Sequence, residues 1–324
     1  NRVAPDGNFM GSPAAPPRIG ASRFLICSMT GTFWKSVPVP DWTVARFGLR
    51  FDEMMSSEGR IDLIRENILG FGNQMVVTGQ LGQRRNLFMV GTRNSRIYSS
   101  LYSFNIRAYR QFWQRRLFEG SYIHDYDDER YGNLVSVGQQ MDKLGNALFQ
   151  FKTETALSRY PLNASRRNAQ KELRSFVVRT LIDSYDRYPF PNNGYINQIY
   201  IESAMKVLGG SEQYAKIFWG GSYVRTYWRK HTFGGAFFLG TADPSIPDIE
   251  SFTLGGDATR LNCYNWSSTA SHFYADFPGL ADEERFGTRL TVGKLYYRLF
   301  IPRQFYLDLI YSAGNVWPDR KSVV

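Results

Sequence analysis

Long stretches of this chain alternate apolar and polar side chains with a period of two. In the stretch LYSFNIRAYRQFW, which begins at Leu101, the apolar residues Tyr102, Phe104, Ile106 and Ala108 are separated by a serine, an asparagine and an arginine. A period of two places the apolar side chains on one face of a β-strand and the polar side chains on the other. The chain is therefore predicted to be all-β.

We expect about thirteen strands, with boundaries uncertain by a few residues. They fall near 43–54, 60–69, 73–83, 86–96, 101–113, 129–142, 146–158, 172–185, 195–209, 213–229, 231–241, 287–300 and 304–316. Turn signals such as PNNG at Pro191 and LGGS at Leu208 separate them. No segment has the pattern of an amphipathic helix.

Two architectures fit this alternation. A soluble sandwich buries its apolar face, whereas an outer-membrane barrel turns the apolar face to lipid and the polar face to its lumen. Many predicted strands span ten residues or more and carry Arg, Gln, Glu and Asn on the polar face. Tilted membrane-crossing strands have about this length, and soluble strands are usually shorter. An aromatic content of 16% fits the aromatic belts of membrane proteins. The pattern favours a transmembrane antiparallel β-barrel.

The remaining composition leaves the ligand class open. The net charge of +10 fits nucleic acid, lipid phosphates or a lumen lined with arginines and acids. Cys27 and Cys263 do not make a disulfide framework. Motifs of hydrolases, nucleotide-binding proteins and metalloproteases are absent and the three histidines are isolated, so we expect no catalysis, no metal and no cofactor. The acidic run HDYDDER from His124 is predicted to be a solvated loop.

The segment RTLIDSYDRYPFPNNGYI, from Arg179, carries Asp183, Asp186, Pro189 and Gly194. This arrangement resembles a strand-end signature of the bacterial surface-antigen barrels. The superfamily includes the BAM and TAM assembly factors and the two-partner secretion transporters. The resemblance implies that the two aspartates shape the end of a strand. We prefer this role to acid–base chemistry.

The segment FTLGGDATRLNCY, from Phe252, resembles the tip of the long extracellular loop that folds back into the lumen of these barrels. Arg260, Leu261 and Tyr264 match the variant found in barrels attached to patatin-like lipases, whereas Asn262 and Cys263 replace an expected serine and glycine. VPDWTVARFGLRFDE from Val39 is similar to the first strand of that group. YLDLIYSAGNVW from Tyr306 resembles a Phe-x-Asp-x-Gly strand in which Ser312 replaces the aspartate and Gly314 is retained.

The resemblance implies that Arg260 reaches into the lumen and pairs with acids on the wall. A guanidinium suits this role because it stays charged and binds carboxylates bidentately. With Ser312 in place of the usual acid, the alternative partners are Asp308, Glu202 and Glu154. Gly255 and Gly256 are expected to turn the loop with positive φ, and Tyr264 to pack beneath it.

The resemblance covers roughly residues 40–317. It predicts a barrel over 41–324, preceded by 1–40 as a linker or the remnant of an upstream periplasmic region. Three further strands follow the matching segment in the family, so a complete barrel of about sixteen is expected, because a closed bacterial barrel has an even number. Either the C-terminal strands are missing from this chain, or another subunit covers the edge.

These features imply an integral protein of the bacterial outer membrane that inserts or translocates polypeptides, with a seam between its first and last strands. Its expected partners are membrane lipid, lipopolysaccharide, client polypeptides and neighbouring subunits. Two alternatives stay open. The barrel could anchor a patatin-like phospholipase whose catalytic domain lies outside the chain, or the chain could be a soluble basic β-domain that binds nucleic acid.

Overall fold

The structure is a computed structural model. It describes residues 24–27, 32–39, 43–52, 56–68, 73–94, 100–119, 121–141, 145–161, 166–187, 190–228, 230–256, 274–275, 277–281, 283–301 and 305–317. No helix within these ranges is both long enough and apolar enough to cross a membrane.

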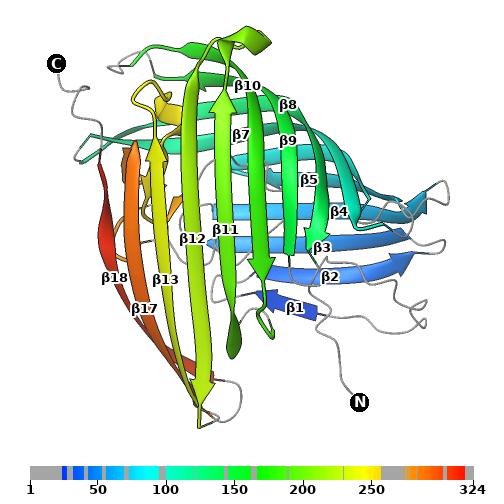
Figure 1. Ribbon diagram of the computed structural model, residues 1–324, viewed down its shortest axis with the longest axis vertical. Coiled ribbons are helices and arrows are strands. Elements are labelled where there is room, and N and C mark those ends of the chain that lie inside the picture. The colour runs from blue at the N-terminus through cyan, green and yellow to red at the C-terminus, as the bar shows by residue number, and fades with distance from the viewer. Residues whose placement is uncertain are drawn as a thin grey trace.

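One antiparallel sheet of fifteen strands dominates the described residues, and each strand pairs with its neighbour in chain order (Figure 1). Its strands are β1 (Phe24–Cys27), β2 (Thr32–Val39), β3 (Thr43–Asp52), β4 (Ser56–Ile68), β5 (Asn73–Gly82), β6 (Arg85–Asn94), β7 (Tyr102–Glu119), β8 (Ser121–Met141), β9 (Gly145–Arg159), β10 (Ala169–Asp183), β11 (Asn193–Ala204), β12 (Tyr214–Tyr227), β13 (His231–Ala242), β17 (Arg289–Ile301) and β18 (Phe305–Trp317). Thirteen strands of this sheet, β3 to β13 with β17 and β18, overlap the predicted segments, because the period-two pattern identified each of them. The largest difference is at β8, which begins at Ser121 and not near residue 129.

The first two strands lie within residues 1–40, the region expected to be a linker or the remnant of an upstream periplasmic region. β2 pairs antiparallel with β3 and β1 pairs with β2, so Phe24–Cys27 and Thr32–Val39 extend the sheet at its edge. The sequence TFWKSVPV of β2 is rich in β-branched and aromatic residues, which favour strands.

The faces of the sheet have the polarity of a membrane barrel. In β4, Asp62 is only 7% exposed, whereas its neighbours Ile61 and Leu63 are each 47% exposed. The buried carboxylate accepts a hydrogen bond of 2.7 Å from the Thr78 hydroxyl on β5. On this strand the apolar side chains point outward and the polar side chain points inward, which is the barrel arrangement rather than the soluble one.

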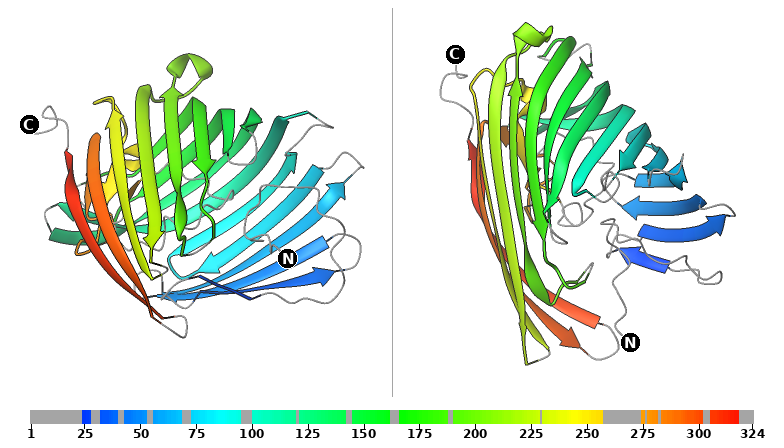
Figure 2. Two further views of the ribbon diagram at one scale, coloured as in Figure 1. Left: turned by 60° about the horizontal axis from the view of Figure 1, so that its bottom comes forward. Right: turned by 45° about the vertical axis from the view of Figure 1, so that its right-hand side comes forward.

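The sheet curls strongly, so that its polar face becomes concave (Figure 2). Within the described residues it does not close, and β1 and β18 form its two edges. A smaller sheet of β14 (Phe252–Leu254), β15 (Tyr274–Ala275) and β16 (Arg285–Gly287) belongs to the long connection between β13 and β17. In Figure 1 its yellow and orange strands lie behind β13 and β17, on the inner side of the curve.

Apolar contacts hold this small sheet against the wall. Phe252 and Leu254 of β14 are buried to 1% and 0% exposure in one cluster with wall residues. The wall members of that cluster are Val177, Tyr200, Phe218, Phe238, Leu290, Val292 and Val316. Burial of two large apolar side chains contributes roughly 1.5–3 kcal/mol each, so the described part of the connection is docked in the concavity.

An arginine introduced on the outer face should destabilise the protein. Ile199 of β11 is 37% exposed there, and Ile199→Arg should lower the free energy of unfolding by about 2–4 kcal/mol because the charge would lie in lipid. The measurement is urea denaturation of the full-length protein in phospholipid vesicles.

The matched control is Val207→Arg, since Val207 is 87% exposed in the turn η1 (Lys206–Leu208) outside the strands. Its effect should stay within about 0.5 kcal/mol. Equal stability of the two variants would show that the outer face does not meet lipid.

Candidate functional site

The candidate site is the charged concave wall together with the docked segment that covers part of it. The turn η2 (Asp248–Glu250) leads directly into β14, and it buries Ile249 and Glu250. The segment thereby carries a carboxylate to a wall whose inward side chains include arginines and lysines.

Glu250 lies between two cations of different strands. One carboxylate oxygen is 2.5 Å from Arg130 of β8, and the other is 2.9 Å from Lys216 of β12. Arg130 also donates a hydrogen bond of 3.0 Å to the carbonyl oxygen of Ile249. Glu250 is 1% exposed, so its charge is neutralised by the wall and not by water.

The wall continues this network across β11 and β9. Glu202 of β11 pairs with Lys216 at 3.1 Å and with Lys152 at 2.7 Å. It also accepts hydrogen bonds from Ser175 at 2.8 Å and Tyr200 at 2.9 Å. These four partners come from β9, β10 and β12 and, in the case of Tyr200, from β11 itself.

Glu154 of β9 joins the same network through Arg130. Its carboxylate lies 3.2 Å from the Arg130 guanidinium and accepts a hydrogen bond from the Tyr109 hydroxyl of β7. Arg130 is also fixed by Asp128 on its own strand, at 3.0 Å. Three carboxylates thus surround one guanidinium.

A second contact fixes the far end of the docked segment. Glu283 lies 2.7 Å from Arg115 of β7, and Arg115 lies 3.2 Å from Asp128. Both side chains of the Arg115–Glu283 pair are less than 5% exposed. Asp128 therefore links the Glu283 contact to the Glu250 contact through two arginines.

We call the connected buried charges of the wall and the docked segment the lumen network. It contains four cations and five carboxylates. Its members are Arg115, Arg130, Lys152 and Lys216 with Asp128, Glu154, Glu202, Glu250 and Glu283. Buried charges are tolerated when each is paired, and removal of one partner costs about 3–5 kcal/mol. The network is thus able to hold the segment in one discrete position.

Every carboxylate in the lumen network has a cationic partner. The described residues contain no group of histidine, cysteine and acidic side chains able to hold a metal.

The structure places Glu202 and Glu154, two of the expected partners of Arg260, inside the lumen network. Arg260 itself lies outside the described residues, as do Leu261 and Tyr264, so its docking stays a prediction. Both carboxylates already have cations from the wall.

The third expected partner, Asp308, lies elsewhere. It forms a bidentate pair with Arg298 of β17, with distances of 2.7 and 2.8 Å. Ser312 pairs with Lys294 in the strand register. Gly314 lies opposite Val292, where a Cβ would be 2.4 Å from the Thr291 carbonyl oxygen. Gly314 therefore permits close packing of β17 and β18.

The strand-end residues between β10 and β11 shape the backbone. The Asp183 carboxylate accepts a hydrogen bond from the Tyr185 amide at 3.0 Å, and Asp186 accepts from the amides of Asn192 and Asn193 at 2.8 and 3.1 Å. Gly194 has φ of 122°, and a Cβ there would be 2.3 Å from the Ser184 carbonyl oxygen. Pro189 lies outside the described residues.

The two glycines after β14 adopt the left-handed backbone. Gly255 and Gly256, for which the sequence suggested positive φ, have φ of 133° and 86°. A Cβ on Gly255 would be 2.0 Å from the Ala281 carbonyl oxygen. The backbone at Gly255 therefore approaches the returning half of the segment too closely for any other residue.

The prediction of a solvated loop at HDYDDER is wrong. Residues 124–130 lie within β8, and Asp128 and Arg130 are 2% and 4% exposed. Arg115 of β7 and Arg130 of β8 neutralise Asp128, so the run supplies two of the nine members of the lumen network. The sequence did contain a signal for this buried strand. Asp128 and Arg130, like Lys152 and Glu154, are opposite charges two residues apart, which places them on the same face of a strand.

Comparison with known proteins identifies the family. A model of the Omp85 superfamily domain matches residues 67–323. No match was found among curated proteins.

Solved structures give the same fold. BamA from Haemophilus ducreyi lacking POTRA domains 1–3 aligns with a TM-score of 0.70 at 11% identity, over 92% of this chain and 63% of that one. CdiB from Escherichia coli aligns with a TM-score of 0.54 at 11% identity, and the alignment covers 92% of this chain and 56% of CdiB. CdiB from Acinetobacter baumannii aligns with a TM-score of 0.53 at 12% identity, and the alignment covers 86% of this chain and 50% of that protein. The chain thus spans less than two thirds of the length of each of these structures.

Removal of the Glu250 charge should release the docked segment. Glu250→Gln leaves Arg130 and Lys216 without this carboxylate, and we expect a loss of about 3–5 kcal/mol. Limited proteolysis of the full-length protein in detergent should then cut residues 243–288 faster than in the unchanged protein.

The control is Glu212→Gln, which removes one partner of the half-exposed Lys171–Glu212 pair, 2.7 Å apart. Such surface pairs contribute about 0–1 kcal/mol, so cleavage should be unchanged. Identical cleavage of the two variants would mean that Glu250 does not hold the segment.

Proposed function

The chain belongs to the Omp85 superfamily and is a β-barrel protein of the bacterial outer membrane, and from this premise we propose that it inserts polypeptides into that membrane or passes them across it. The observation that carries the proposal is the family match over residues 67–323. Barrels of this superfamily are transporters or insertases, and this activity needs no catalytic residue.

The concave wall supports this function. A polypeptide that passes along the lumen exposes backbone amides and carbonyls, and a wall of paired charges can solvate them where lipid cannot. In the described state the segment from Ile246 to Leu254 occupies part of this wall. We propose that the segment plugs the lumen and that the lumen network sets the free-energy cost of moving it.

The edges of the sheet support the first of the two proposed activities, the insertion of polypeptides into the membrane. An unpaired strand edge is a template for another strand. Within the described residues β18 pairs with β17 alone. We propose that a seam between the first and last strands of the complete barrel opens to lipid or to a client strand. Client polypeptides and subunits that cover an edge are the corresponding partners.

Neither alternative function gains support. The matching family model and the three solved structures named above are neither patatin-linked barrels nor nucleic-acid-binding proteins. Four of the cations instead have a structural role within the wall, where they pair with five carboxylates. Contact with lipopolysaccharide phosphates stays part of the proposal.

Vesicle reconstitution tests the proposed function. Full-length protein in phospholipid vesicles should accelerate membrane insertion of a urea-unfolded outer-membrane barrel, or transfer of an unfolded secreted polypeptide into the vesicle, by about tenfold or more over empty vesicles. Protease protection of the client reports both outcomes. Rates equal to those of empty vesicles for both clients would refute the proposal.

The plug is tested separately by conductance across a planar bilayer. Replacement of residues 243–288 by a short Gly-Ser linker should raise single-channel conductance, because the docked segment no longer fills the lumen. Glu212→Gln serves as the control with unchanged conductance. If the linker variant remains folded and conducts no better than the unchanged protein, the plug is excluded.

A further inference from the structure

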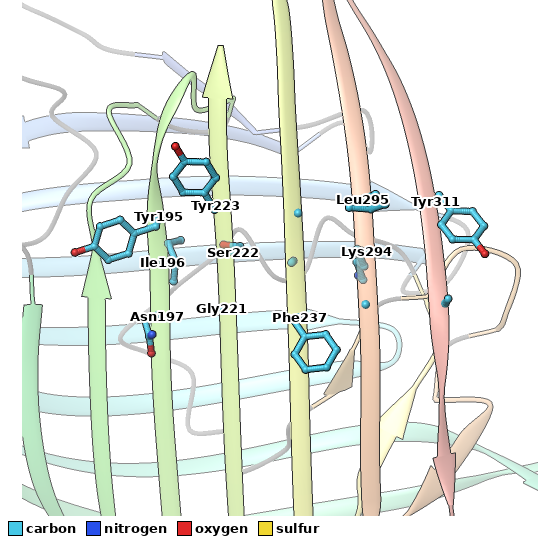
Figure 3. Close-up of a pocket in the computed structure, with 14 residues that line it drawn as sticks. Tyr195, Ile196, Asn197, Gly221, Ser222, Tyr223, Phe237, Lys294, Leu295 and Tyr311 are labelled. Atoms are coloured by element: carbon cyan, nitrogen blue, oxygen red, sulfur yellow. The ribbon is translucent and has the colours of Figure 1, made fainter. Parts of the chain in front are cut away.

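The outer face of β12, β13, β17 and β18 contains a hollow that the lumen network does not explain. Small residues form its floor, namely Gly221, Gly235, Gly293 and Ala313, one on each strand. The hollow has a volume of about 610 Å³, which lies in the usual range of ligand sites. Large side chains project around it (Figure 3).

Two of these glycines are not required by packing within the chain. A Cβ on Gly235 would lie 3.5 Å from its nearest atom, and a Cβ on Gly293 would lie 3.6 Å from its nearest atom, both ordinary contact distances. Neither residue has positive φ. Glycine within a strand is unfavourable by roughly 0.5–1 kcal/mol relative to alanine, and it often marks a bulge, a bend at a barrel corner or the close approach of a ligand or another backbone.

The walls of the hollow are apolar and aromatic. Tyr223 on one side is 52% exposed, and Leu295 and Tyr311 on the other side are 64% and 68% exposed. Figure 3 shows Tyr195 and Tyr223 separated from Leu295 and Tyr311 by the strand that carries Gly235. A flexible hydrocarbon chain fits such a furrow better than a rigid polar ligand does.

A second hollow of about 560 Å³ adjoins the first and shares Tyr223, Gly235, Leu295 and Tyr311 with it. It contains one cation, Arg225, an exposed residue of β12. The guanidinium lies 5.5 Å from the centre of the Tyr227 ring. Among the described residues no carboxylate pairs with Arg225, so its charge is available to an anion on the outer face.

The position of Arg225 indicates the depth of this site in the membrane. Only residues 228–230 connect β12 to β13, whereas residues 243–288 connect the opposite end of β13 to β17. Barrels place short turns in the periplasm and long loops outside the cell. Trp228, 81% exposed, and the His231–Tyr297 hydrogen bond of 2.7 Å add aromatic groups typical of the interface at this end.

We propose that this furrow holds one glycerophospholipid of the periplasmic leaflet whose headgroup carries net negative charge. One acyl chain lies over Gly235 and Gly293, between Tyr223 and Tyr311. The phosphate meets Arg225, because a guanidinium binds phosphate oxygens bidentately. The small residues of the floor serve to keep the furrow open.

Native mass spectrometry tests this site on full-length protein purified in a mild detergent and incubated with dioleoyl phosphatidylglycerol. The unchanged protein should retain this lipid in preference to dioleoyl phosphatidylcholine. Gly235→Leu fills the furrow and excludes the acyl chain, and Arg225→Gln removes a charge-assisted hydrogen bond to the phosphate. Each variant should reduce retained phosphatidylglycerol by about tenfold.

The matched controls lie on the same outer face. Gly79 of β5 has no atom within 4 Å of a built Cβ, and Arg65 is an exposed arginine of β4. Gly79→Leu and Arg65→Gln should retain the lipid as the unchanged protein does. A shift in gel mobility between unboiled and boiled samples verifies that each variant is folded, and Arg225→Gln provides the test if Gly235→Leu fails to fold.

Three results would overturn the site. The first is equal retention of phosphatidylglycerol and phosphatidylcholine by the unchanged protein. The second is retention of phosphatidylglycerol by folded Gly235→Leu and Arg225→Gln at the level of the controls. The third is a preference of the unchanged protein for lipid A over phosphatidylglycerol. The polypeptide insertion rate is measured separately, so failure of this site is distinguishable from failure of the proposed function.

Discussion

The carboxylate of Glu250, held between Arg130 and Lys216, is the contact on which the interior depends. It joins the segment between β13 and β17 to strands that are distant in sequence, and it is shielded from water. Through Arg130 it shares Asp128 with the Arg115–Glu283 pair, so both ends of the described segment are tied to the same buried charges. Because these charges are buried and paired with one another, release of the segment would leave buried charges without partners, at a cost of about 3–5 kcal/mol for each partner removed.

The placement of charged side chains on the inner face also explains why the outer face is apolar. A sheet that turns arginines, lysines and acids inward must turn its Phe, Leu, Ile and Tyr residues outward, and this is stable only where the surroundings are apolar. Exposed large apolar side chains occur on strands from β3 to β18. Against this background the glycine floor across β12, β13 and β17 is a local interruption of an otherwise continuous apolar surface.

The thirteen strands from β3 to β18 were predictable because a period of two is a local property of the sequence. The lumen network was only half predictable. Glu154 and Glu202 follow from the polar face of their strands, but Arg130 and Glu250 are 120 residues apart, and Arg115 and Glu283 are 168 residues apart. Those pairings depend on how the sheet curls. The dependence on long-range pairing also explains the wrong prediction at HDYDDER. The acidity of this run suggested a solvated loop, whereas arginines from elsewhere in the fold supply the counter-charge.

The most direct test of the account is heat-modifiability of the full-length protein after detergent extraction from membranes. A closed barrel with a charged interior and an apolar exterior resists SDS until it is boiled, so the account predicts a faster-migrating band in the unboiled sample. Identical mobility before and after boiling, together with recovery of the protein from the soluble fraction, would contradict it. The apolar face would then need another partner than lipid.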